Sequence, residues 1–306
     1  MAEVATFATS DQLLVVIDPV ARQMDGESVR IAKDVLSAGA ATKVCLPDGP
    51  EEFARALARR GARRPVVIGD DRALARAVAL LHRQRELAGC ALSVVPVGPL
   101  LGVAHALGVP SGAVAAARAV LDGAVRRLDV LVDDSDGVVL GALSVPPLGG
   151  SDPAAPAGGP QGAPVAPCAE ELAAMGAWLR SCHARVRNLV ASRPVRGGGG
   201  PGAGGAPVAW GDGPARLRVE VDGDTLVDLE QPVEGVSVTP GGAGSAAVEV
   251  RPVSIGAEAA PLRAAGRRIT ISGPDFRYRA DAAVSGPVRR RTWTVWEGAL
   301  GLVLPG

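Results

Sequence analysis

Short apolar runs alternate with amphipathic segments over the first 124 residues of the chain. The runs end at Gly, Pro or Asp, are too short for helices, and lie at residues 12–17, 42–46, 66–68 and 91–95. They are typical of buried strands. After Asp71, by contrast, Leu74, Val78 and Leu81 recur with helical spacing, while arginines occupy the other face. Strands that alternate with helices predict a doubly wound parallel sheet covered by helices on both faces.

The periodicity changes after residue 124. Residues 125–132 and 137–145 have the pattern of strands, and from Leu217 the apolar positions recur at every second residue. Further strands are expected at residues 236–239, 247–253, 268–272, 276–280, 292–296 and 300–304. These short, alternating segments predict an antiparallel β-sandwich.

The two patterns predict two domains. Residues 1–124 form an α/β domain of nucleotide-binding type, and residues 125–306 form the β-sandwich domain, with the option that its last segment returns to the first domain. Gly/Pro-rich linkers are expected at residues 146–167 and 193–207, with a helix at 172–189 between them.

Composition excludes some classes of function. The 32 basic and 32 acidic residues give a formal net charge of zero, which argues against a nucleic-acid binder. The four cysteines and three histidines lack the paired spacing of a zinc site. Without a signal-peptide pattern or an apolar run of about 20 residues, we expect a cytoplasmic protein, with peripheral membrane contact and oligomeric state left open.

Two of the predicted strands end in Gly-containing turns. They are Val66–Asp71, with the sequence VVIGDD, and the strand that leads into Val95–Pro110, VPVGPLLGVAHALGVP. In a parallel sheet, such turns lie together at the carboxyl edge and form a crevice suited to a phosphate-bearing ligand.

These segments resemble the catalytic domain of the diacylglycerol kinase and sphingosine kinase family, which has an NAD kinase/diacylglycerol kinase-like fold. Asp18-Pro19 stands where the family has Asn-Pro, and Ile68–Arg72 where it has Gly-Gly-Asp-Gly-Thr. The next family motif, Pro-Leu-Gly-Thr-Gly-Asn-Asp-Phe-Ala-Arg followed by Leu-Gly-Ile-Pro, is matched without a gap at Pro96, Gly98, Ala104, Leu107, Gly108 and Pro110.

The resemblance implies transfer of the γ-phosphate of ATP to a lipid hydroxyl, with Mg²⁺, in a cleft between the two domains. It implies catalytic roles for Asp70 and, near the acceptor, for Asp281. It implies that the nucleotide is contacted by Asp18, Gly69, Asp71, Arg72, Pro96 and Gly98. The ligands of the metal ion are not identified by the resemblance.

The departures from the family pattern lie where chemistry would occur. Asp71 replaces a Gly and adds negative charge beside the expected phosphate, although Arg72, which replaces Thr, could pair with it. Pro99–Gly102 replaces Thr-Gly-Asn-Asp, and Asp281-Ala282-Ala283 replaces Asp-Gly-Glu, so the presumed general base is missing. We therefore expect a weak or catalytically degenerate lipid kinase. The alternatives are a working kinase with rearranged groups, or a non-enzymatic nucleotide- or lipid-binding scaffold.

Three weaker signals have two interpretations each. The acidic run Asp133–Gly137 is either a hairpin turn or a site for a divalent cation, and Asp222-Gly223-Asp224 is either a hairpin turn or a displaced catalytic pair. Arg289–Arg291, with Trp293 and Trp296, forms either an ordinary strand or a contact with an anionic membrane surface.

Overall fold

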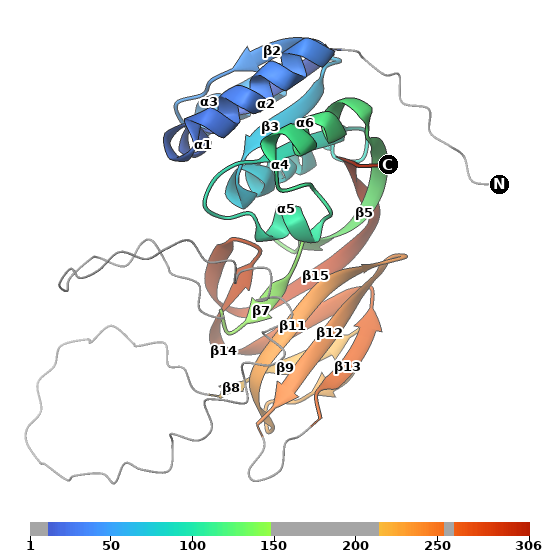
Figure 1. The fold of residues 1–306 in the computed structure, drawn as a ribbon. Helices are drawn as coiled ribbons and strands as arrows, with labels where there is room; N and C mark the ends of the chain where they lie inside the picture. The colour runs from blue at the N-terminus through green and yellow to red at the C-terminus, as the bar shows by residue number, and fades with distance from the viewer. Residues whose placement is uncertain (1–11, 148–213, 254–259) are drawn as a thin grey trace, which may run out of the picture. The chain divides into compact units, whose positions relative to one another are not determined.

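The computed structural model describes residues 12–147, 214–253 and 260–306 (Figure 1). They build a parallel sheet with helices and a strand-rich part. The predicted helix at 172–189, the linker at 193–207 and most of the linker at 146–167 lie outside the described residues.

The first four strands form the parallel sheet. Their order is β2-β1-β3-β4, and their bounds are β1 (Gln12–Ile17), β2 (Ala41–Cys45), β3 (Arg64–Gly69) and β4 (Ala91–Pro96). The helices that accompany them are α1 (Pro19–Met24), α2 (Gly26–Gly39), α3 (Pro50–Ala58), α4 (Asp71–Arg83), α5 (Gly102–Ala106) and α6 (Ala113–Asp122). Strand and helix alternate here as the sequence pattern predicts.

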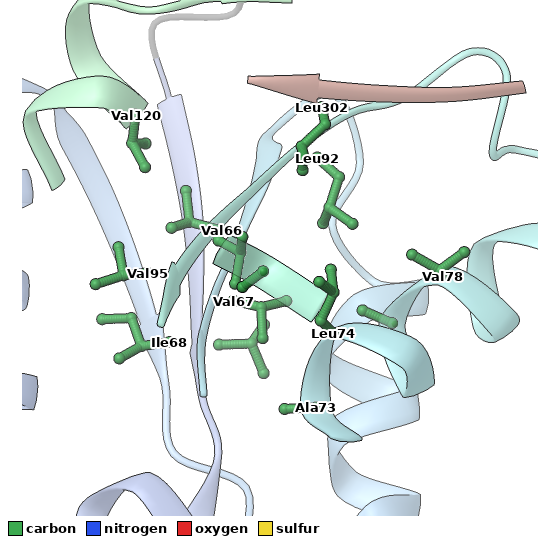
Figure 2. Packing of buried hydrophobic residues seen from close by; sticks show 14 of the residues in the cluster. Val66, Val67, Ile68, Ala73, Leu74, Val78, Leu92, Val95, Val120 and Leu302 are labelled. Carbon is green, nitrogen blue, oxygen red and sulfur yellow. The ribbon is translucent and has the colours of Figure 1, made fainter. Parts of the chain in front are cut away.

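Helices cover the sheet on both faces, because its central strands are apolar on both sides. Helix α2 packs beside α6, and α3 beside α4. Figure 2 shows Val120 of α6 on one side of the central strands, and Leu74 and Val78 of α4 on the other. These three side chains are at most 1% exposed. The doubly wound sheet is confirmed.

The remaining strands pair antiparallel with one another. They are β5 (Ala124–Asp133), β6 (Val138–Val139), β7 (Leu143–Val145), β8 (Ala215–Arg216), β9 (Arg218–Val221), β10 (Asp224–Val227), β11 (Pro232–Gly242), β12 (Ser245–Pro252), β13 (Leu262–Gly266), β14 (Arg268–Ala280) and β15 (Ala283–Leu304). They enclose a second apolar core, in which Trp293 is fully buried. The predicted β-sandwich class is confirmed.

Strand β15 connects the two parts. Most of it pairs with β14 and β5, but near its end Gly301 and Leu302 pair in parallel with Ala91 and Leu92 of β4. The last segment of the chain therefore extends the wound sheet. A domain boundary at residue 124 stays a prediction, because β5 and β15 run side by side along both parts.

The structure differs from the sequence pattern in several elements. The predicted strand at 137–145 is two strands, β6 and β7, and the short strands β8 and β10 were not predicted. The segments 268–272 and 276–280 are one strand, β14, and 292–296 and 300–304 are one strand, β15, with an irregularity between Trp296 and Leu300. The pattern also missed strand β13 and helix α1. Helix α1 follows Asp18 because proline is favoured in the first turn of a helix, where its missing N–H costs nothing.

No helix in the described part of the chain is both long enough and apolar enough to span a membrane.

Candidate functional site

The candidate site lies at the carboxyl edge of the wound sheet, where β1, β3 and β4 end. Backbone hydrogen bonds join these ends: the Asp18 N–H donates to the Ile68 carbonyl over 2.9 Å, and the Val97 N–H to the Gly69 carbonyl over 3.0 Å. The structure thus brings together the turns in which the sequence predicts nucleotide-binding residues.

Two glycines allow these turns to pack closely. A Cβ atom on Gly69 would lie 2.6 Å from the Ala73 Cβ of helix α4 and 3.0 Å from the Asp18 Cβ. Gly98 has φ +137°, and a Cβ there would lie 2.9 Å from the Asp70 Cβ. Both positions need glycine for close approach within the chain itself.

Asp70 caps helix α4. Its Oδ1 accepts hydrogen bonds from the backbone N–H groups of Arg72 at 3.0 Å and Ala73 at 3.1 Å, and the residue is 5% exposed. The N–H of Asp71 donates to the Leu100 carbonyl, and that of Leu74 to the Asp70 carbonyl. The N–H groups of Asp71, Arg72 and Ala73 therefore have partners within the chain, and that of Leu74 makes the first hydrogen bond of the helix itself.

Asp71 caps helix α5 in the same way. Its two carboxylate oxygens accept hydrogen bonds from the N–H groups of Val103 at 2.8 Å and Ala104 at 2.9 Å. Burial raises the pKa of the Asp71 carboxyl above its ordinary value of 3.8, against the effect of these two N–H groups, and the charge of Asp70 raises it further. Asp71 faces α5 rather than an open crevice.

Asp18 is buried in an ion pair. Its Oδ2 lies 2.8 Å from Nη1 of Arg76, and its Oδ1 accepts the Val20 N–H at the start of α1. The Arg76 guanidinium also lies over the Phe53 ring, 5.4 Å from its centroid. Arg76 was not among the predicted site residues, although it lies one helical turn after Arg72 and so on the same side of α4.

Arg72 differs from these carboxylates because its side chain is exposed and has no hydrogen bond or ion pair with the described residues. It remains a cation at the start of α4 that can reach a ligand.

Asp281 lies in the turn between β14 and β15, with φ +51°. Its carboxylate accepts hydrogen bonds from the N–H groups of Leu140 and Gly141, both at 2.7 Å, and of Ala142 at 3.1 Å. The loop that it holds packs on α5, since a Cβ on Gly141 would lie 3.6 Å from Val103 Cγ1. Nothing in the sequence indicated this loop as the partner of Asp281, because the two are about 140 residues apart.

Asp281 and Asp71 interact electrostatically. Burial is the largest cause of the raised pKa of the Asp281 carboxyl; the three N–H groups lower it, and the charge of Asp71 raises it. The structure therefore brings Asp70, Asp71 and Asp281 into one region, but the carboxylate of each is engaged by backbone N–H groups.

The raised pKa values predict a pH dependence of stability. A folded protein whose carboxyls have pKa values above 3.8 binds more protons than its unfolded chain, so their contribution to stability is complete below pH 3.8 and is lost as the pH rises through the folded values. We expect the unfolding free energy of the wild type, minus that of Asp71→Asn, to fall between pH 4 and pH 7. Urea titrations of both proteins across this range measure it. A difference that stays level or rises would contradict the prediction.

A cavity of about 250 Å³ opens beside these turns. It is lined by Met24, Asp25, Ser28, Pro96, Val97, Gly98, Pro99, Leu101, Ser111 and Ala113. Of the predicted nucleotide-binding residues, only Pro96 and Gly98 contribute to its wall. The segment from Met24 to Ser28 was not predicted to line a site; the signal that it offers is Asp25, a residue type favoured as a helix cap.

The weaker signals correspond to structural features. Asp133 closes the β5–β6 hairpin by accepting hydrogen bonds from Ser135 and Gly137, and Asp222-Gly223 forms the β9–β10 turn. Within the described residues, no group of three or more His, Cys, Asp or Glu side chains is placed to hold a metal ion.

Comparisons with known proteins give a consistent result for the fold. No family model and no curated protein sequence matches the chain. Among solved structures, one described as "a putative diacylglycerol kinase" from Bacillus anthracis str. Sterne has a TM-score of 0.64 at 13% identity, covering 96% of this chain and 97% of that one. A structure of a diacylglycerol kinase from the same organism has a TM-score of 0.62 at 12% identity, with the same coverage. Over nearly its whole length, the chain has the fold of these proteins.

Proposed function

We propose that this chain is a diacylglycerol kinase-like protein in which ATP-dependent phosphoryl transfer to a lipid hydroxyl is weak or lost. Its fold supports the first half of the proposal, because the similar structures are described as diacylglycerol kinases. The motif residues at the carboxyl edge of the sheet support the second half.

The observation that carries the proposal is the engagement of the first turn of α4. A polyphosphate bound at a helix N-terminus needs free backbone N–H groups, and here Asp70 and the Leu100 carbonyl accept from three of them. A phosphate would have to displace a carboxylate that is already in place, and Asp71 adds a second carboxylate at the next residue. The residues present therefore do not fit the ATP–Mg²⁺ group that the resemblance implies.

The acceptor side of the reaction is also altered. Asp281, the residue that the resemblance assigns there, holds the loop from Leu140 to Ala142 through three hydrogen bonds. Ala283 stands where the family has Glu. Loss of a general base typically costs about 10²–10⁴-fold in rate, and loss of one preorganised donor about 10²–10³-fold.

Incubation of the purified chain with labelled ATP, Mg²⁺ and diacylglycerol tests the proposal. We expect phosphatidic acid to form at least about 100-fold more slowly than with an active diacylglycerol kinase assayed alongside. Formation at a comparable rate, abolished in Asp70→Ala and reduced in Arg72→Gln, would overturn it. Arg72 is the suitable second variant because its exposed side chain has no partner among the described residues.

A second candidate function is non-enzymatic binding of a nucleotide or lipid. The cavity beside Pro96 and Gly98 favours it, because about 250 Å³ approaches the lower end of the range of small-molecule sites, roughly 300 Å³. Thermal stabilisation by ATP without formation of phosphatidic acid would support this candidate. Failure of both ATP and diacylglycerol to stabilise the protein would count against it.

A further inference from the structure

A dense group of arginines lies at the opposite, amino edge of the wound sheet. Strands β3 and β4 begin there, and the segments that lead into them follow the ends of α3 and α4. We call this group the amino-edge surface; it consists of Arg59, Arg60, Arg63, Arg64, Arg83, Arg85, Arg126 and Arg127.

Contacts within the chain make this surface continuous. Arg60, before β3, forms an ion pair with Glu86, before β4. Arg127 of β5 donates from Nη1 to the Ala88 carbonyl over 2.6 Å, which joins β5 to the same segment. The strand pairing also places these segments together, because Gly301 of β15 pairs with Arg127 of β5 on one side and with Ala91, the first residue of β4, on the other.

The charge of this surface is one-sided. Its three segments, residues 59–64, 83–88 and 126–127, contain eight arginines and a single acidic residue, Glu86, whereas the whole chain is neutral. Arg59, Arg83 and Arg126 are exposed and have no hydrogen bond or ion pair from their side chains to the described residues. Their charges are therefore available to a partner.

An aromatic side chain lies at the margin of the surface. Trp296 is 47% exposed, and its ring packs edge-on against the ring of His82, with 4.9 Å between the two centroids. His82 directly precedes Arg83 in the chain. Arginine beside exposed tryptophan is typical of protein surfaces that bind the interface of an anionic bilayer.

The other membrane surface that the sequence suggested, Arg289–Arg291 with Trp293 and Trp296, has fewer side chains available to a bilayer. Arg289 pairs with Asp275 at 2.9 Å, and Arg291 with Asp134 at 2.6 Å. Trp293 is fully buried. In that group, Arg290 is the one exposed arginine without an ion pair to the described residues, and Trp296 is the one exposed tryptophan.

We propose that the amino-edge surface binds the anionic headgroups of a phospholipid bilayer. The arginines come from the end of a helix, from loops and from the strands β3 and β5 along one edge, which suits a broad partner. The neutral chain as a whole argues against a nucleic acid. The candidate site, at the carboxyl edge, then faces away from the bilayer, in agreement with weak or lost transfer to a membrane lipid. The inference does not rest on the proposed function, because binding to vesicles needs neither ATP nor turnover.

Vesicle co-sedimentation of the full chain tests the inference. We expect binding to phosphatidylcholine vesicles that contain about 30% phosphatidylglycerol, no binding to pure phosphatidylcholine, and release at high salt as the charges are screened. Each arginine near an anionic surface contributes about fivefold in affinity, so Arg59→Gln, Arg83→Gln and Arg126→Gln together should weaken binding roughly 100-fold.

A matched control removes three other exposed arginines whose side chains have no hydrogen bond or ion pair with the described residues, through Arg118→Gln, Arg268→Gln and Arg290→Gln. Both triple variants lose the same charge, and all six positions are exposed, so the fold is retained in each; circular dichroism verifies this. Only the first variant should lose affinity. Equal losses in both variants, no binding of the wild type to anionic vesicles, or binding to nucleic acid but not to vesicles would each overturn the inference.

Discussion

Replacing Asp281 with alanine lowers the free energy of unfolding by about 3 kcal/mol. The carboxylate accepts three backbone hydrogen bonds from the loop Leu140–Ala142, and alanine leaves all three N–H groups without a partner. Each such loss costs about 1 kcal/mol. Alanine is also disfavoured at φ +51°, where aspartate and asparagine are better tolerated. Urea unfolding monitored by circular dichroism measures the change.

Two further variants separate this loss from a general effect of removing a charge. Asp281→Asn keeps the Oδ1 acceptor for Gly141 and Ala142 and tolerates the same φ, so its loss should be smaller than that of the alanine variant. Asp275→Ala removes an exposed partner of Arg289 and should lower the free energy of unfolding far less than Asp281→Ala, because water screens an exposed ion pair. An Asp281→Ala protein as stable as Asp275→Ala would show that the loop does not depend on this carboxylate.

Asp70→Ala should lower the free energy of unfolding by about 2 kcal/mol. The side chain caps a helix of three and a half turns through two N–H groups and is almost inaccessible to water. Loss of a capping side chain costs roughly 0.5–2 kcal/mol, and burial of the unpaired donors places this case at the upper end. Chemical denaturation of the purified variant tests the value.

Asp25 provides the matched control, because it caps α2 from an exposed position, where it accepts the Ser28 N–H. Asp25→Ala should lower the free energy of unfolding by clearly less than Asp70→Ala, because water replaces the lost partner at an exposed cap. Asp70→Asn, which keeps the accepting oxygen, should lie close to the wild type. If Asp70→Ala unfolds no more easily than Asp25→Ala, Asp70 is not engaged in capping, and the argument that it fills the start of α4 fails.

The elements of the wound sheet followed from local pattern. The helical spacing of Leu74, Val78 and Leu81 predicts α4, and all three side chains are fully buried. A helix can be predicted from such a pattern because its geometry places side chains three or four positions apart on the same face. The same reasoning separated β14 and β15 into pieces, because their polar interruptions resemble turns when the partner strands are unknown.

The candidate site was predictable in its location but not in its contacts. Asp70, Asp71 and Asp281 do lie in one region, as the motif order implies. However, Asp71 finds its partners 32 and 33 residues away, and Asp281 finds its partners 139 to 141 residues away. No periodicity or motif spacing encodes which N–H a carboxylate will face across such distances.

The amino-acid order alone determined that strands alternate with helices before residue 124 and that alternating strands follow, because burial periodicity is a local property of the chain. The tertiary structure alone decided that β15 returns to β4, that three arginine-bearing segments meet at one edge of the sheet, and that the carboxylates of the candidate site face backbone N–H groups. These features depend on packing between distant segments. A buried polar group without a hydrogen-bond partner costs free energy, so each carboxylate is oriented toward the donors that the fold brings near it.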